Sequence, residues 1–176
     1  MENQTVPPSV DPAVFRKTMG CFATGVTIVT TKNGSELQGM TVNSFTSVSL
    51  QPPLILVCLS LGARTTAAVE ARGWFAVHIL EERQKELSDR FARAEEDHYA
   101  GVEYALNDYD LPELPGCLAR LICRVHRVDP GGDHRIILGE VVKAEMREGR
   151  PLLFSRGAYG AMASAPPASG GASPVP

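Results

Sequence analysis

Short apolar runs rich in β-branched residues alternate with turn signals along most of the chain. Residues 26–31 and 37–42 flank an Asn-Gly dipeptide, which accepts the positive φ of a tight turn, and they predict a β-hairpin. Residues 54–59 follow two prolines that exclude a helix, and they predict a buried strand. The runs 117–128 and 134–146 are joined by Asp-Pro-Gly-Gly-Asp and predict a second hairpin.

The spacing of apolar residues changes to a helical period in three places. Asp11 suits an N-cap, Pro12 suits the first helical position, and Gly20 ends this short predicted helix. Residues 65–73 predict a second short helix, and 81–93 predict an amphipathic helix with a solvated charged face. The positions at helical intervals in this last stretch are Leu80, Gln84, Leu87, Ser88 and Phe91.

Residues 74–80 and 152–156 add two strand-like runs, whereas 95–115 is polar and irregular. A connection of that length in a compact domain predicts a functional loop or a partner contact. Roughly six or seven closely spaced strands linked by hairpins, with a few short helices, favour an antiparallel barrel. A doubly wound parallel sheet is disfavoured because strands and helices do not alternate regularly.

The composition is that of an ordinary globular protein. The 176 residues suffice for one domain, placed at 11–160 between a flexible start, 1–10, and a tail of small residues, 161–176, that we expect to be disordered. The net charge of −3 does not favour a nucleic-acid partner. No run reaches the roughly 18 apolar residues of a membrane span, and the first residues lack a signal-peptide pattern, so we expect a cytoplasmic location.

Several common catalytic and metal-binding motifs are absent from the sequence. The glycines at 20 and 25 have the spacing of a phosphate-binding P-loop, but Val26 stands where that motif requires lysine. No Gly-x-Gly-x-x-Gly follows a strand, and no Gly-x-Ser-x-Gly elbow occurs. The four histidines lack metal-ligand spacing, so no metal site is expected. The cysteines lack Cys-x-x-Cys spacing and are expected to be reduced, buried apolar residues: Cys21, Cys58, Cys117 and Cys123.

A polar stretch between two apolar strands, residues 39–53, is the least ordinary part of the sequence. Six hydroxyl or amide side chains gather there: Thr41, Asn43, Ser44, Thr46, Ser47 and Ser49. Such a stretch either satisfies its own backbone or forms a polar shelf that holds a flat heteroaromatic ligand by its carbonyl edge. Nearby, Arg64, Thr65 and Thr66 at the start of a predicted helix suit a phosphate, although Arg64 fits a plain surface arginine equally well.

Several segments occur in an order typical of a known family. They are FATGVTIVTT, GMTVNSFTSVSLQPPLILVCLS, ART, FAVHIL, FA at 91–92, GDH at 132–134 and PLLFSRGAY. From about residue 11 to residue 159 the chain resembles the flavin reductase-like family. More narrowly, it resembles the short reductase component of two-component flavin-dependent monooxygenases.

The resemblance implies a mainly β fold, the FMN-binding split β-barrel of Greek-key type with a few short helices, assembled as a homodimer with flavin near the subunit interface. It implies an NAD(P)H:flavin oxidoreductase that reduces FAD or FMN by hydride transfer, with NADH favoured over NADPH. The reduced flavin would diffuse to a partner monooxygenase. Two other functions stay open: an electron-transfer flavoprotein with permanently bound FMN, and a flavin-binding protein without turnover.

Matching positions carry the family's site onto this sequence. The implied flavin contacts are Thr41, Val42, Asn43, Ser44 and Ser47 at the isoalloxazine edge, Cys58, Leu59 and Ser60 along the flavin, and Ala63, Arg64 and Thr65 at the ribityl phosphate. His134 is implied on the face where nicotinamide stacks, with Arg156 and Tyr159 closing that side. Ala63 replaces a common serine and His78 a common asparagine, which leaves the phosphate ligands and the choice of FMN or FAD open.

His134 is the candidate catalytic residue. Hydride transfer from nicotinamide C4 to flavin N5 needs close stacking more than it needs an acid, so we interpret His134 as a residue that orients the nicotinamide. A proton role at N1 of the reduced flavin and a purely structural place in the 131–134 turn are the alternatives. The other three histidines are interpreted as satisfied or solvent-facing: His78, His98 and His126. If FAD is the substrate, 95–115 is the expected place for its adenine half.

Overall fold

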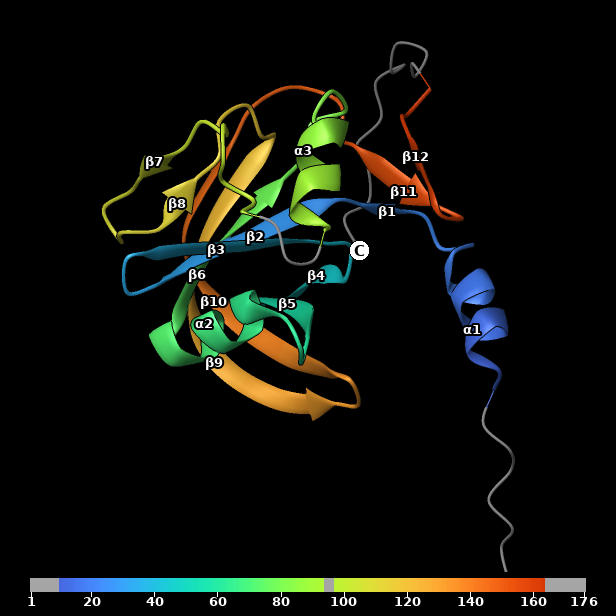
Figure 1. Ribbon diagram of the computed structural model, residues 1–176, viewed down its shortest axis with the longest axis horizontal. Coiled ribbons are helices and arrows are strands. Elements are labelled where there is room, and N and C mark those ends of the chain that lie inside the picture. Colours follow the sequence, from blue (N-terminus) through green and yellow to red (C-terminus); the bar gives the residue numbers. More distant parts are fainter. Residues whose placement is uncertain (1–9, 94–96, 164–176) are drawn as a thin grey trace, which may run out of the picture.

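The computed structural model describes residues 10–93 and 97–163, in which a seven-stranded antiparallel sheet dominates (Figure 1). Its strands, in spatial order, are β3 (Glu36–Val42), β2 (Thr27–Asn33), β6 (Trp74–Ile79), β9 (Ala119–Gly131), β10 (His134–Met146), β5 (Pro53–Ser60) and β4 (Phe45–Leu50). Two small sheets flank it: β1 (Thr24–Gly25) with β11 (Leu153–Ser155) and β12 (Ala158–Gly160), and β7 (Ala105–Leu106) with β8 (Pro112–Glu113). The helices are α1 (Pro12–Met19), α2 (Arg64–Arg72) and α3 (Lys85–Phe91).

The main sheet wraps around on itself because its two edge strands are consecutive in the chain. β3 forms one edge and β4 the other, yet only Asn43 and Ser44 lie between them. The Ser44 carbonyl accepts a hydrogen bond from the N–H of Cys58 on β5 (N···O 3.2 Å), which fixes this junction against the far side of the sheet. The wrap leaves a seam between β3 and β5, as expected of a split barrel.

Both predicted hairpins are confirmed. The β2–β3 turn holds Gly34 at φ +59°, and the β9–β10 turn holds Gly132 at φ +73°, a conformation that glycine adopts without steric cost. The expected buried strand 54–59 lies within β5 but is buried on one side only. Alternate residues such as Val57 face the core, and their neighbours are partly exposed because only one face of this strand packs inward.

The interior is filled by two main apolar clusters. One lies within the wrapped sheet and includes Phe75 and Val29. The other lies beneath α3 and includes Phe91, Leu80 and Ile28. Strand β2 contributes to both clusters because successive strand residues point to opposite faces of the sheet. The sheet is therefore covered on the face that carries α3.

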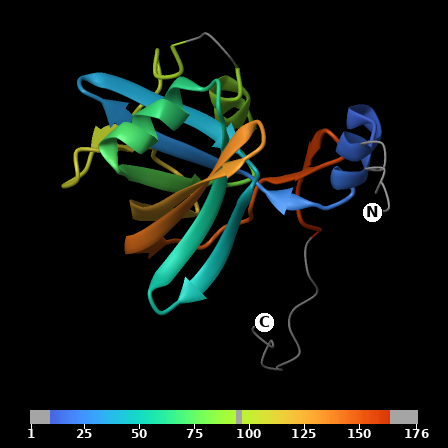
Figure 2. The ribbon, with the colours of Figure 1, turned by 90° about the horizontal axis from the view of Figure 1, so that it is seen from below.

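Helix α1 begins where the sequence predicts. The Asp11 carboxylate accepts hydrogen bonds from the N–H groups of Ala13 and Val14 (2.8 and 3.0 Å), which caps the helix. The helix has no buried residue. With β1, β11 and β12 it forms an extension, here called the arm, that stands away from the main sheet (Figures 1 and 2).

The predicted helix 65–73 is confirmed as α2, which ends at Gly73 in the left-handed conformation (φ 72°). Helix α3, in contrast, is shorter than the predicted helix 81–93. Glu81 forms a β-bridge with Pro151, and the N–H of the next residue donates to the Arg150 carbonyl (2.9 Å). These contacts hold the first residues of the predicted helix extended, so the helix begins only at residue 85.

The described part of the predicted irregular segment 95–115 packs against the main sheet. Leu111 and Leu114 are buried, and the Pro112 carbonyl accepts a hydrogen bond from Thr30 Oγ1 on β2 (2.7 Å). The segment also contains the β7–β8 pair. It is therefore a part of the fold as well as a boundary of the site described below.

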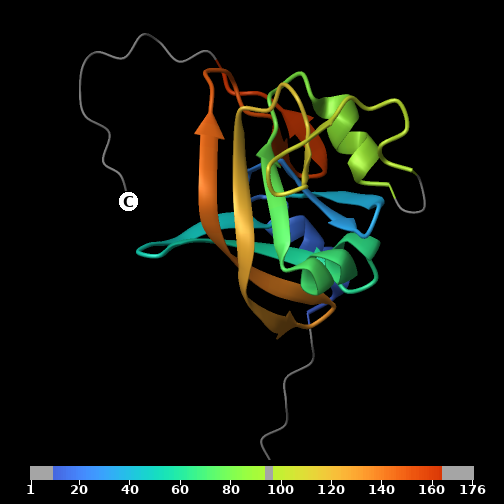
Figure 3. The same ribbon diagram turned by 90° about the vertical axis from the view of Figure 1, so that its left-hand side faces the viewer.

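The outer parts of the molecule differ in how far they extend from the sheet. The β4–β5 hairpin projects from the body, with Leu50 exposed at its tip (Figures 2 and 3). The predicted flexible start, 1–10, and disordered tail, 161–176, lie outside the described residues apart from 10 and 161–163. In the part of the chain that the structure describes, none of the helices combines the length and the apolar character that crossing a membrane requires.

Candidate functional site

A cavity of about 640 Å³ opens beside the seam, between β3, the end of β5 and the residues that follow α3. Its wall consists of Gln38, Gly39, Met40 and Thr41 from β3, Ser60, Gly62, Ala63, Arg64 and Thr65 from the β5–α2 connection, and Phe91, Ala92, Arg93 and His98. Five residues of the predicted site thus line one cavity: Thr41, Ser60, Ala63, Arg64 and Thr65. The volume lies within the range of about 300–1,000 Å³ that is typical of small-molecule sites.

The β5–α2 connection forms the end of the cavity that suits an anion. Thr66 Oγ1 and the N–H of Ala63 both donate to the Ser60 carbonyl (2.7 and 3.2 Å), which fixes the turn. Arg64 and Thr65 are the first residues of α2, where backbone N–H groups have no helical acceptor. With the Arg64 guanidinium in the wall, this end can bind a phosphate although Ala63 adds no hydroxyl.

Two hydroxyls of the polar stretch 39–53 form hydrogen bonds to other elements of the fold. Thr41 Oγ1 donates to the Ser88 carbonyl on α3 (2.7 Å). Ser44 Oγ donates to the Cys58 carbonyl across the seam (2.8 Å). Both side chains therefore bond to backbone carbonyls of other elements, α3 and β5, and not to the backbone of their own stretch.

The other predicted flavin contacts in this region differ in how far their side chains are exposed. The Asn43 and Ser47 side chains are exposed at the junction and on β4. Val42 and Leu59 are buried in the core, so only their backbone atoms can reach a ligand at the seam. Cys58 is half-buried, and burial raises the pKa of its thiol.

Ser88 is fully buried and joins two residues of the predicted site. Its carbonyl accepts the Thr41 hydroxyl, and its own Oγ lies 2.9 Å from the Tyr159 hydroxyl. The Tyr159 ring also contacts the Lys85 ammonium (5.3 Å to the ring centroid), and burial raises the pKa of the phenol. Sequence reasoning missed Ser88 as a site residue. A polar residue at a core-facing helical position is the signal that identifies it.

His134 opens β10 directly opposite Ser60 of β5. Opposed residues of antiparallel strands share a face of the sheet, so the His134 and Ser60 side chains lie on the same face, although His134 is not part of the cavity wall. Its Nδ1 is 2.6 Å from the Asp133 carboxylate, and this hydrogen bond lowers the pKa of Asp133. The Asp133 carbonyl accepts the N–H of Leu61, which ties this turn to the end of β5 (3.0 Å).

Arg156, like His134 and Tyr159, is not part of the cavity wall. It belongs to the arm, where it adopts a left-handed conformation (φ 51°) and its N–H donates to the Gly20 carbonyl (2.8 Å). It lines a separate cavity of about 460 Å³ together with Arg16, Lys17 and Cys21. Tyr159, which also belongs to the arm, contacts Ser88 of α3, and Ser88 in turn contacts Thr41 in the cavity wall.

The residues after α3 form a wall that sequence reasoning did not assign to the site. The ring of Phe91 lies over Gly39, where an added Cβ would be only 2.7 Å from it. His98 lies between two carbonyls, with Nδ1 2.8 Å from Gly39 and Nε2 2.7 Å from Arg93. The Phe-Ala pair at 91–92 in the family pattern was the available signal.

The remaining histidines have the expected structural environments. His78 is fully buried, its Nδ1 donates to the Ile28 carbonyl and its Nε2 accepts from the N–H of Leu114 (both 3.2 Å). Burial lowers the pKa of His78 to about 4. His126 is exposed to solvent. Together with the two bonds of His98, these environments confirm the interpretation as satisfied or solvent-facing residues.

The four cysteines are free thiols, and their burial varies. Cys123 is buried as expected, and Cys58 and Cys117 are half-buried. For Cys21 the expectation of burial is wrong, because it follows α1, which packs against no core. Among the residues that the structure describes, no three His, Cys, Asp or Glu side chains gather as a metal site would require.

Comparison with known proteins identifies the family. Residues 19–163 match the family model described as the flavin reductase like domain. The chain belongs to the flavin reductase-like family. The matched span contains all of the cavity wall, His134 and the strands of the arm.

Relatives within this family share most of their length with the chain. It is 41% identical over 152 residues to the reductase subunit HsaB of a flavin-dependent monooxygenase from Rhodococcus jostii (86% of this chain, 78% of that protein). It is 42% identical over 159 residues to the FMN reductase (NADH) SmoA of Agrobacterium fabrum (90% and 91%). The solved structure of the NADH:FAD oxidoreductase SgcE6 of Streptomyces globisporus, in complex with NAD and FAD fragments, matches with a TM-score of 0.84 at 40% identity (89% and 98%). The fold expected from the sequence is therefore confirmed.

Proposed function

We propose that this protein is a flavin reductase that uses NADH to reduce FAD or FMN and releases the reduced flavin to a separate monooxygenase. The observation that carries the proposal is the cavity beside the seam, which combines an anion-binding end at Arg64 and Thr65 with the polar residues Gln38 and Thr41 of β3. The names of HsaB, SmoA and SgcE6 support the same reaction. In this reaction a hydride passes from nicotinamide C4 to flavin N5, and a proton is added at N1.

The residues of the chain bind and orient the flavin. The start of α2 holds the ribityl phosphate through backbone N–H groups and the Arg64 guanidinium. At the isoalloxazine edge, Asn43 and Ser47 offer exposed side chains, whereas Val42 and Leu59 act through their backbones. Gly39, which has no Cβ, lets the Phe91 ring pack directly against β3 in the cavity wall.

His134 occupies the side of the site on which we place the nicotinamide. Its ring is hydrogen-bonded to the exposed Asp133 carboxylate at the start of β10, where the backbone is paired with Ser60. We expect His134→Ala to lower the rate of flavin reduction by NADH by roughly tenfold, while the flavin Kd changes less. Stopped-flow kinetics and a flavin titration measure the two quantities. Equal losses in rate and affinity would identify a structural turn residue instead.

The proposal includes a homodimeric assembly, a monooxygenase partner and a cytoplasmic location. A homodimer would cover the exposed apolar residues of the arm, which include Phe15 and Phe22. The partner that receives reduced flavin is a flavin-dependent monooxygenase, as the description of HsaB supports. The four free thiols support a cytoplasmic location, because the cytoplasm is a reducing environment.

The test of the proposed function is NADH oxidation by the purified protein with and without added flavin, after its visible spectrum has been recorded. We expect a colourless protein that consumes NADH only when free FAD or FMN is supplied. A yellow protein that is indifferent to added flavin would show a permanently bound FMN and an electron-transfer role. Flavin binding without NADH consumption would show a binding protein without turnover.

A further inference from the structure

Two polar side chains in the wall of the cavity beside the seam are buried without a hydrogen-bond partner. Gln38 on β3 is 8% exposed, and Thr65 at the start of α2 is 3% exposed. Among the residues that the structure describes, none forms a hydrogen bond with the Gln38 amide or the Thr65 hydroxyl. A buried polar group in this state lowers the stability of the protein, unless a bound molecule supplies the missing bond.

Other polar groups near this cavity are paired. The Thr41 and Thr66 hydroxyls each donate to a backbone carbonyl (both 2.7 Å). The fully enclosed side-chain atoms that lack a partner lie elsewhere in the described part of the chain: Thr24 Oγ1, Arg72 Nε and Arg120 Nε. The polar atoms of Gln38 and Thr65 are therefore not enclosed by protein, and they are open to the cavity whose wall they form.

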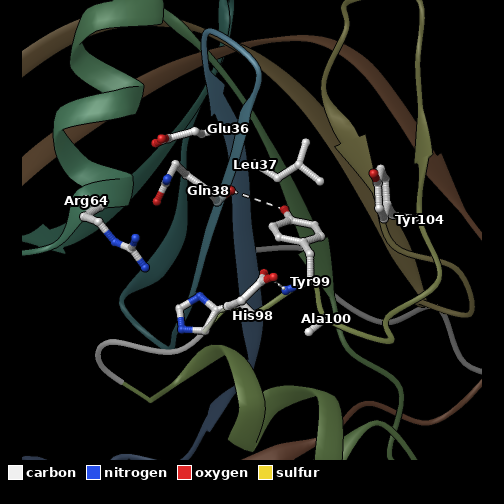
Figure 4. A pocket seen from close by; sticks show the side chains of 9 residues that line it. Glu36, Leu37, Gln38, Arg64, His98, Tyr99, Ala100 and Tyr104 are labelled. Atoms are coloured by element: carbon white, nitrogen blue, oxygen red, sulfur yellow. Dashed lines mark hydrogen bonds between the residues drawn. The ribbon is translucent and has the colours of Figure 1, made fainter.

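The two unpaired groups face the cavity from different elements. Gln38 belongs to β3, and Thr65 belongs to the first turn of α2, where backbone N–H groups have no helical acceptor. Figure 4 shows the Gln38 amide turned toward the side on which Arg64 lies. Of the described residues, those in the wall of this cavity include Arg64 and Arg93 and no carboxylate, whereas Glu36 lies in the wall of the neighbouring cavity. The described wall therefore carries a net positive charge.

This set of groups matches the chemistry of a phosphate. An amide NH₂, a hydroxyl and the N–H groups at a helix start all donate hydrogen bonds, and the oxygens of a phosphate dianion only accept them. A guanidinium in the same wall adds charge attraction. FMN, FAD and NADH carry phosphate groups, and riboflavin carries none.

We propose that Gln38 is a specificity-determining residue of the flavin site. Its amide and the Thr65 hydroxyl donate to the flavin phosphate from opposite walls, so that the protein binds phosphorylated flavins in preference to riboflavin. This inference rests on the proposed function, since the ligand is the flavin assigned to this cavity. The phosphate is assigned to the flavin because both groups line the flavin cavity itself.

The first test is Gln38→Leu, which removes the amide but keeps the backbone carbonyl that accepts the Tyr99 hydroxyl (3.2 Å). We expect the Kd for FMN, measured by quenching of flavin fluorescence, to rise by roughly tenfold, the scale of one hydrogen bond to a charged group. The Kd for riboflavin should stay within about twofold. The melting temperature of the flavin-free variant should equal or exceed that of the wild type, because an apolar side chain of similar size replaces an unpaired amide.

A second variant, Gln38→Glu, keeps the size of the side chain and reverses its chemistry. Its carboxylate would lie beside the phosphate, so we expect the Kd for FMN to rise by more than in Gln38→Leu, again with riboflavin within about twofold. Gln51→Glu is the matched control, because it places the same charge at an exposed position between β4 and β5. It should leave the Kd for both flavins unchanged.

The outcomes separate this inference from the proposed function. Equal losses for FMN and riboflavin, with a lowered melting temperature, would show that Gln38 is a structural residue and would overturn the inference. An unchanged Kd for FMN with a raised KM for NADH would overturn it in favour of a phosphate of the dinucleotide, and unchanged values throughout would overturn it as well. A wild-type protein that binds FMN without consuming NADH would overturn the proposed function and not the role of Gln38.

Discussion

At the scale of single residues, the buried His78 makes the stability of the folded protein depend on pH. Its folded pKa of about 4 lies below the ordinary value of 6.5 because burial disfavours the charged ring. Below pH 6.5 the unfolded chain therefore takes up a proton that the folded protein does not. The free energy of unfolding should fall by about 1.4 kcal/mol per pH unit between pH 6.5 and about 4, or about 3 kcal/mol in total. Urea unfolding at several pH values measures this slope.

His78→Asn is the control for this prediction. The asparagine amide can still donate to the Ile28 carbonyl, but it does not titrate. We expect a variant that is less stable at neutral pH, because Leu114 loses its acceptor, with a flatter decline in acid. The same slope in both proteins would show that other groups govern the acid response.

Asn43 is the residue of the polar stretch through which we expect the largest effect on flavin affinity. Its side chain is exposed at the β3–β4 junction, where the flavin edge is proposed to lie. Asn43→Ala should weaken FMN binding by roughly 1–3 kcal/mol, the range of one or two hydrogen bonds. Thr46→Ala is the matched control, since its hydroxyl makes only a local bond to the Ser47 carbonyl (3.3 Å). An unchanged affinity in Asn43→Ala would remove the junction from the site.

The polar stretch also shows how far a sequence can define a site at this scale. The hydroxyls in residues 39–53 predict a ligand-binding shelf, and residues 39–41 of this stretch line the cavity. This pattern did not separate Asn43 from Ser44, because the Ser44 hydroxyl is used by a carbonyl fourteen residues away on β5. A hydrogen-bond partner that is distant in the chain has no local pattern in the sequence.

At the scale of elements, the contact between β3 and α3 depends on a missing side chain. An added Cβ at Gly39 would lie 2.7 and 2.9 Å from two atoms of the buried Phe91 ring. Gly39→Ala should therefore destabilise the protein by about 1–3 kcal/mol, the usual cost of overpacking. Gly25→Ala, which meets nothing within 4 Å, should stay within about 0.5 kcal/mol. Thermal unfolding compares the two variants, and equal stabilities would show that the Phe91 ring can move aside.

Elements were predictable where their cause is local. The hairpins follow from Asn-Gly and Gly-Gly turns, and α1 follows from its cap at Asp11. The start of α3 was not predictable, because Glu81 is held by Pro151 from a later part of the chain. The packed part of 95–115 was missed for the same reason, since Thr30 on β2 fixes Pro112.

At the scale of the whole molecule, the arm predicts self-association. Its α1 region exposes large apolar side chains, with Phe15 57% and Phe22 72% accessible. We expect sedimentation at twice the chain mass of 18.9 kDa. Phe15→Asp combined with Phe22→Asp should shift the protein toward the monomer, because a charge at an apolar interface is costly to bury.

The control for this prediction lies at the other end of the molecule. Leu106 is exposed on β7, which lies far from α1 in Figures 1 and 2. Leu106→Asp should leave the sedimentation unchanged. A wild-type protein that sediments as a monomer at micromolar concentration would contradict the prediction, and so would a dimer that survives the changes in α1.

Ser88 makes the arm and the cavity floor mechanically dependent on each other. The arm cannot swing away from the main sheet without breaking the contact between Tyr159 and Ser88, and α3 cannot shift without pulling on Thr41. We therefore expect contacts that restrain the arm to restrain β3 as well, at the point where β3 lines the cavity. If a bound flavin restrains this wall of the cavity, flavin binding and self-association through the arm favour each other by the same factor, because coupling between two binding events is reciprocal.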